Sequence, residues 1–169
     1  IDLERWLGQQ DLNIPGNILI CSQLAKNLAD AHRLDVAHGD VHPRNVKIRR
    51  DGDLPVAVLI DWDNAAISGL PAPRSPGAKR FLAPESMAAL LDSREFPPDM
   101  YTERCSAAKV FHWLLFGREF YHTNDEDLFV QQSLRGAWNS DPASGSVDAT
   151  VLGGLPNTWI STRLAESFR

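Results

Sequence analysis

The chain has 169 residues, of which 43% are hydrophobic and 23% charged, and its formal net charge is −5. A chain of this length buries one core, so we expect a single domain or lobe. The acidic balance argues against general binding of nucleic acid, and apolar stretches as short as 56–60 and 113–116 cannot cross a membrane. Cys21 and Cys105 lack metal-ligand spacing, which favours buried thiols in a reducing, cytoplasmic compartment over disulfides or a zinc site.

The N-terminal part of the chain is predicted to be helical. Residues 2–10 have the pattern of a short helix, and Ile-Pro-Gly-Asn at 14–17 is typical of a turn. From there to Leu34, apolar residues recur at helical spacing, with polar residues on the other face. We therefore expect an amphipathic helix in this region.

A loop and a β-hairpin are predicted next. Pro43 disfavours helix within 36–45. Val46 and Ile48 then alternate with polar neighbours, Asp-Gly-Asp at 51–53 is a turn signal, and 56–60 is an apolar strand. The two strands should pair as an antiparallel hairpin.

The remaining elements are again mainly helical. We expect a Pro-rich loop over 64–80, a short helix over 84–91 and a nearly all-apolar, buried helix over 102–116 that ends at Gly117. A further helix is predicted over 125–134, a mobile Ser/Gly/Asp/Ala-rich loop over 139–154, and a last helix from Leu155 that the end of the chain cuts short.

The loop before the hairpin carries the residues that point to chemistry. Asp40 precedes Asn45 by five residues, and Asp61 follows the second strand. Transfer of a phosphoryl group to a hydroxyl needs a carboxylate that orients and deprotonates the hydroxyl, together with oxygen ligands for Mg²⁺ on the nucleotide phosphates. These three residues supply such a set.

This arrangement resembles the C-terminal lobe of the protein-kinase fold, over nearly the whole chain. Four landmarks follow one another in the family's order: the loop 38–48 with its Asp and Asn, Asp61, the segment 77–85 that ends in Ala-Pro-Glu, and the buried helix with its exit at 117–120. The resemblance implies an α+β, mainly α-helical fold in which a small β-hairpin carries the catalytic and metal loops.

The resemblance also implies roles for individual residues. Asp40 would be the general base, and His42, which stands where the family usually has Lys, would contact the transferred phosphate. Asn45 and Asp61 would bind ATP through Mg²⁺. His38 is expected to order the loop, and Glu103 matches an Asp that braces the catalytic loop from the buried helix.

Several departures from the family are informative. Gly39 replaces the Arg that pairs with a phosphorylated activation loop, so activation by that route is not expected. Asp63 replaces the Gly of Asp-Phe-Gly, which favours atypical bacterial kinases. The sequence His-Gly-Asp at 38–40 resembles aminoglycoside phosphotransferases instead. Glu85 would expect an Arg partner late in the lobe, beyond Arg169 or supplied by Arg163 or Arg169.

No glycine-rich phosphate loop or strand Lys is present in the sequence. We therefore expect residues 1–169 to be one kinase-like C-terminal lobe, a fragment that lacks its N-terminal ATP-binding lobe, is truncated at its C-terminus and is inactive alone. The expected activity is ATP-dependent phosphorylation of Ser/Thr hydroxyls of a protein substrate. A small-molecule phosphotransferase and a non-catalytic pseudokinase scaffold are the alternatives.

Overall fold

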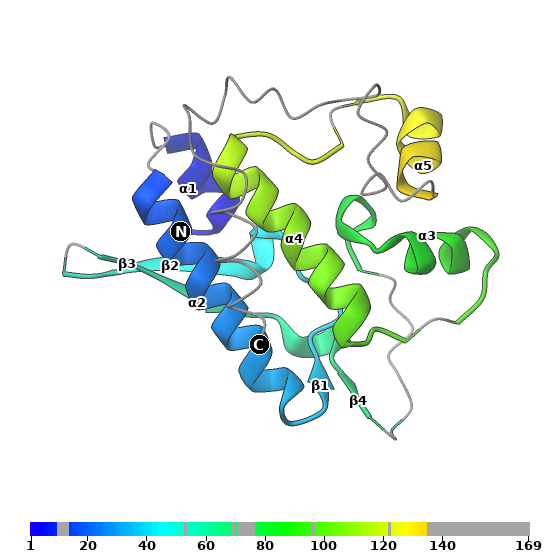
Figure 1. Cartoon of the computed structure of the whole chain (residues 1–169), viewed down its shortest axis with the longest axis horizontal. Helices are drawn as coiled ribbons and strands as arrows, with labels where there is room; N and C mark the ends of the chain where they lie inside the picture. The colour runs from blue at the N-terminus through cyan, green and yellow to red at the C-terminus, as the bar shows by residue number, and fades with distance from the viewer. Residues whose placement is uncertain are drawn as a thin grey trace, which may run out of the picture.

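The computed structural model describes residues 1–9, 14–52, 54–68, 70, 77–95, 97–121 and 123–134 (Figure 1). Its helices are α1 Leu3–Gln9, α2 Ile14–His32, α3 Pro84–Leu91, α4 Met100–Phe116 and α5 Glu126–Leu134. Its strands are β1 Val36–Ala37, β2 Val46–Asp51, β3 Leu54–Leu59 and β4 Ala66–Ile67, and short 3₁₀ turns occupy Pro43–Asn45, Trp62–Asn64 and Lys79–Phe81. This is an α+β architecture with mainly helical content, which agrees with the expected class.

The main core forms where α2 and α4 lie side by side, with the β2–β3 hairpin and α1 packed against them (Figure 1). Helix α2 contributes an apolar stripe at four-residue spacing, Ile20, Leu24 and Leu28, each of which is at most 1% exposed. Such a stripe is what a helix needs to bury one face. The loop that contains Asp40 follows the C-terminal end of α2, after the short strand β1.

The start of α2 differs from the prediction. Residues 14–17 form the first turn of the helix instead of a separate turn. Pro15 fits there because the first N–H groups of a helix have no intrahelical acceptor and the fixed φ of proline suits a helix. The helix also ends at His32, slightly before Leu34.

The predicted hairpin is confirmed. β2 and β3 pair antiparallel, with Val46 opposite Leu59 and Asp51 opposite Leu54, and Gly52 takes a φ of +60° in the turn. The second strand is less buried than its composition indicates, because Leu54 and Val58 face solvent. Because the two strands are antiparallel, the residues before β2 and after β3 lie at the same end of the hairpin.

A second, very short sheet was not predicted. β1 and β4 pair antiparallel, with Val36 opposite Ile67 and Ala37 opposite Ala66. Strands of two residues are too short to show the alternation by which strands are recognised in a sequence. Their pairing joins the two ends of the segment that carries the loop, the hairpin and Asp61.

Helix α4 has clear start and stop signals. Asp99 and Thr102 form a reciprocal capping box, and Gly117 ends the helix with a φ of +68°, as expected. The helix is not purely apolar inside, because Glu103 and Lys109 are buried with its apolar residues. Glu103 contacts Gly39, next to Asp40, and Lys109 contacts the main-chain oxygen of Leu82.

A smaller core lies where α3 packs on α5. It contains Leu82, Met87, Tyr121 and Phe129, and it lies apart from the α2–α4 core (Figure 1). The predicted helices over 84–91 and 125–134 are confirmed here. Among the described residues, no helix has the length and hydropathy needed to span a membrane. The loop and helix predicted after residue 138, and with them Arg163 and Arg169, lie outside the described residues.

Candidate active site

Two separate segments of the chain hold the Asp40 carboxylate. Its Oδ1 accepts a 2.7 Å hydrogen bond from the backbone N–H of Ala78. Its Oδ2 lies 3.3 Å from Nδ2 of Asn45 and 3.5 Å from Nε2 of His42. Partial burial alone would raise the pKa of Asp40, but the hydrogen bonds from His42 and Ala78, with the nearby His38, outweigh it and keep the pKa below 3.8. The carboxylate is therefore ionised near neutral pH and able to accept a hydrogen bond from a hydroxyl.

Asn45 closes the loop on itself. Its Nδ2 donates to the main-chain oxygen of Asp40 at 3.0 Å as well as to the carboxylate. The main-chain oxygen of Asn45 accepts from the N–H of Ile60 at 2.9 Å. None of these contacts uses the side-chain oxygen of Asn45, which is the atom that a Mg²⁺ ion would prefer.

Asp61 follows Ile60 directly, so its main chain lies next to that of Asn45. It has a φ of +64° in the left-handed region and is exposed to solvent. Non-glycine residues are uncommon in that region, although Asp is enriched there, and Asp35 and Ser93 also have a positive φ in this structure. The fold thus brings the two predicted metal ligands to one end of the hairpin.

The donor set fits Mg²⁺ better than a transition metal. Within the described parts of the chain, His, Cys, Asp and Glu form no group of three or more that would hold a metal ion by themselves. Mg²⁺ is typically bound by one or two protein oxygen ligands together with phosphate oxygens and waters. Asn45 and Asp61 supply oxygens of that kind.

The two histidines of the loop act on Asp40 from different sides. His38 is fully buried; its Nδ1 accepts from the N–H of Asp40, its Nε2 lies 2.8 Å from the main-chain oxygen of Ile60, and its ring packs on Trp62. This is the ordering role expected for it. His42 Nδ1 accepts from the N–H of Arg44, so its Nε2 carries the proton that faces Asp40. These contacts do not test the predicted contact of His42 with phosphate, which stays a prediction.

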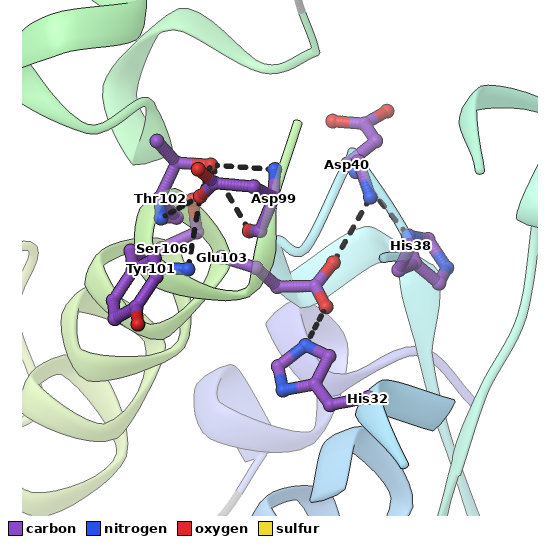
Figure 2. Close-up of polar contacts among 9 residues, drawn as sticks. His32, His38, Asp40, Asp99, Tyr101, Thr102, Glu103 and Ser106 are labelled. Atoms are coloured by element: carbon purple, nitrogen blue, oxygen red, sulfur yellow. Dashed lines mark hydrogen bonds and ion pairs between the residues drawn. The ribbon is translucent and has the colours of Figure 1, made fainter. Parts of the chain in front are cut away.

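Glu103 braces the loop from α4 (Figure 2). Its Oε1 accepts a 2.9 Å hydrogen bond from the N–H of Gly39, and its Oε2 lies 2.5 Å from Nε2 of His32. The contact that the family comparison implied for Glu103 is therefore present, although the side chain is one methylene longer than Asp. His32, which is the last residue of α2, was not singled out in the sequence.

Two glycines allow the segments around Asp40 to approach each other. Gly39 has a φ of +82°, and a Cβ there would lie 2.2 Å from the main-chain oxygen of Asn64. Gly77 has a φ of +73°, and its Cβ would lie 2.9 Å from the main-chain oxygen of Gly39. Only glycine tolerates both the conformation and the contact. In the sequence, Gly39 was of interest because it replaces an Arg of the kinase family. In the structure, the left-handed backbone and the close approach to Asn64 require a glycine at this position.

A shallow hollow of about 360 Å³ opens beside His42. Its lining includes the basic residues Arg44, Lys79 and Arg80 and the stacked rings of Phe81 and Trp113. The guanidinium of Arg80 donates hydrogen bonds to Glu119 and to the main-chain oxygens of Tyr121 and Thr123. The lining also includes His42 and Ala78, two residues that contact the Asp40 carboxylate.

Comparison with known proteins gives limited but consistent support. No protein-family model matches the chain. A curated protein named "Probable serine/threonine-protein kinase FMP48", from Saccharomyces cerevisiae, is 28% identical over 115 residues, which cover 65% of this chain and 30% of that protein. The matched region thus spans less than a third of the relative's length. This similarity supports a kinase-like relationship at a coarse level.

Proposed function

We propose that this chain is the large lobe of a kinase-like phosphotransferase, which transfers the terminal phosphoryl group of ATP to Ser or Thr hydroxyls of proteins in the cytoplasm. The observation that carries the proposal is the Asp40 carboxylate, which is ionised and fixed at both oxygens by Ala78, Asn45 and His42. The name of the yeast relative supports the class of reaction. In this proposal residues 1–169 form one lobe, and a small lobe that binds ATP is its partner.

Asp40 is assigned to the acceptor side of the reaction. Its free lone pairs accept a hydrogen bond from the substrate hydroxyl and align the oxygen with the γ-phosphorus. As the new O–P bond forms, the bond from that phosphorus to the β–γ bridging oxygen breaks, ADP leaves, and Asp40 takes the hydroxyl proton. A carboxylate with a low pKa suits this role because the loose transition state needs orientation more than strong basicity.

The phosphate side is assigned to the end of the hairpin. Asn45 and Asp61 would hold Mg²⁺, which would neutralise charge on the nucleotide phosphates. The contact between Ile60 N–H and the main-chain oxygen of Asn45 fixes the spacing of these two residues. Gly39, held by Glu103, fixes the distance between Asp40 and α4.

The test uses the longest natural polypeptide that contains these residues, incubated with radiolabelled ATP, Mg²⁺ and either a Ser/Thr peptide library or a panel of amino sugars and small alcohols. Labelled peptides are expected, with Asp40→Asn lowering the rate by about 10²–10⁴-fold. Lys26→Met, on the exposed face of α2, serves as the matched surface control. Labelling of small alcohols alone would replace this proposal with a small-molecule phosphotransferase, and an unaffected Asp40→Asn variant would remove Asp40 from the chemistry.

A further inference from the structure

Lys109 lies in the middle of α4 with its side chain buried, 1% exposed. Its Nζ donates a 2.5 Å hydrogen bond to the main-chain oxygen of Leu82 and lies 4.7 Å from the centre of the Tyr121 ring. Lysine is almost never buried to this extent without a specific partner. A buried ammonium in the centre of a helix therefore requires an explanation.

The partner of Lys109 belongs to the same turn that holds Asp40. The N–H of Leu82 donates to the main-chain oxygen of Lys79, and the N–H of Phe81 donates to that of Ala78. Ala78 in turn donates its own N–H to Oδ1 of Asp40 at 2.7 Å. Residues 78–82 are thus one hydrogen-bonded turn, with α4 attached at one end and the Asp40 carboxylate at the other.

Burial disfavours the charged form of Lys109. Removal of the ammonium from water lowers its pKa from 10.5 to about 8, so the folded state disfavours the charge that the unfolded chain carries freely. The ionisable groups that face it are Glu85 from α3, Cys105 from α4 and Tyr121 after α4. Glu85 and Cys105 favour the charge, yet burial outweighs them. An apolar residue of similar volume would fill the site with less penalty.

We propose that Lys109 is a positioning residue of the active site, which holds the 78–82 turn through the Leu82 carbonyl and thereby places the Ala78 N–H that orients Asp40. This inference rests on the proposed function for its effect on catalysis. Its structural part, the attachment of the turn to α4, stands without it. The residue acts through the turn and touches no reacting atom.

The test compares Lys109→Met with wild type and with Lys26→Met in the natural full-length polypeptide. Amide hydrogen exchange is followed by mass spectrometry in a peptide that covers 77–82 and in one that covers 38–41. The Met variant should exchange at least tenfold faster in the first peptide only, because Gly39 in the second is held separately by Glu103. Its melting temperature should equal or exceed that of wild type, and Lys26→Met should change neither quantity.

Catalysis provides the second readout. In Lys109→Met, kcat should fall about tenfold while KM for ATP stays constant, since the turn affects Asp40 and not the nucleotide. The neutral Lys109 amine is a weaker donor to the Leu82 carbonyl than the ammonium, so wild-type kcat should also fall as the pH is raised through about 8, and this decline should be absent from the Met variant. The wild-type pH profile needs no substitution and keeps the inference testable if the Met variant does not fold.

The outcomes separate the two proposals. Unchanged exchange at 77–82 together with unchanged kcat in Lys109→Met would overturn the positioning role. Faster exchange at 77–82 in a protein that labels no acceptor would support the role of Lys109 in holding the turn and refute the proposed phosphotransfer.

Discussion

Two buried charges of α4 contact segments that flank Asp40, and their surroundings differ. At the first turn, Glu103 has a partner for each oxygen, the N–H of Gly39 and the ring of His32. In the middle, Lys109 has one main-chain carbonyl and an aromatic face. The first arrangement satisfies every buried group, whereas the second leaves an ammonium that its surroundings disfavour. From this comparison we expect the charge of Glu103 to stabilise the fold and the buried charge of Lys109 to destabilise it.

The largest effect is expected at the first turn. Glu103→Ala leaves the N–H of Gly39 and the His32 ring without their acceptor, and each unsatisfied buried group costs about 1–3 kcal/mol. The free energy of unfolding, measured in urea, should fall by about 2–5 kcal/mol. Glu103→Gln keeps one acceptor oxygen and should lose less. A loss below about 1 kcal/mol in the Ala variant would remove the contrast with Lys109.

A substitution at Gly39, in the loop that Glu103 holds, should lower stability nearly as much. In Gly39→Ala the new Cβ would meet the main-chain oxygen of Asn64 at 2.2 Å in a left-handed conformation. We expect a loss of about 2–4 kcal/mol in the urea unfolding free energy, from strain and displacement of the loop. Gly52→Ala is the matched control, because Gly52 has a φ of +60° with nothing within 4 Å of its Cβ. It should lose only about 1 kcal/mol, and equal losses at both sites would show that conformation alone matters.

The buried charge of Lys109, in the middle of α4, should lower stability, and this loss should become smaller as the pH rises. The folded pKa of Lys109, about 8, lies below its ordinary value of 10.5, so between these values the unfolded state binds more protons and stability rises with pH. The gain is about 1–3 kcal/mol and should vanish in Lys109→Met. Burial raises the pKa of Cys21 from 9.0 to about 12, which lowers stability above pH 9 in both proteins. The difference between wild type and variant in urea midpoints at pH 7.5 and 9.5 removes that contribution, and a difference that does not change with pH would contradict the assignment.

The smallest effect is expected for a charged pair outside both regions. Lys26 and Asp30 form an exposed i,i+4 ion pair on α2 at 2.7 Å. Such pairs contribute about 0.3–0.5 kcal/mol, so Lys26→Met should shift the urea midpoint hardly at all and the shift should disappear in 1 M salt. A loss of stability as large as that of Glu103→Ala would mean that burial does not determine how much these charges contribute to stability.

Local signals in the sequence predicted most of the secondary structure. The stripe of Ile20, Leu24 and Leu28, the turn at Asp51-Gly52 and the stop at Gly117 each act within a few residues. The start of α2 was placed too late because Pro15 and Gly16 are as compatible with a first helical turn as with a β-turn.

The contacts that assemble the candidate site were harder to predict, since they join distant segments. His32 meets Glu103 across 71 residues, and Asp40 meets Ala78 across 38. Motif spacing selected Asp40, Asn45 and Asp61, but no periodicity reveals which N–H will bind a carboxylate. Lys109 was overlooked because one charged residue hardly alters an apolar helical pattern, although a lone Lys in such a pattern is the signal that could have found it.

The short β1–β4 pair has a consequence for the way the chain folds. It closes the whole segment 38–65 into one loop, within which Asp40, Asn45 and Asp61 all lie. Closure of a long loop carries an entropic penalty that a two-residue ladder cannot offset alone. The β2–β3 hairpin shortens the effective loop because its own strands are close in sequence. The hairpin should therefore form first, and the three residues should come together in one late step when the ends of the loop meet.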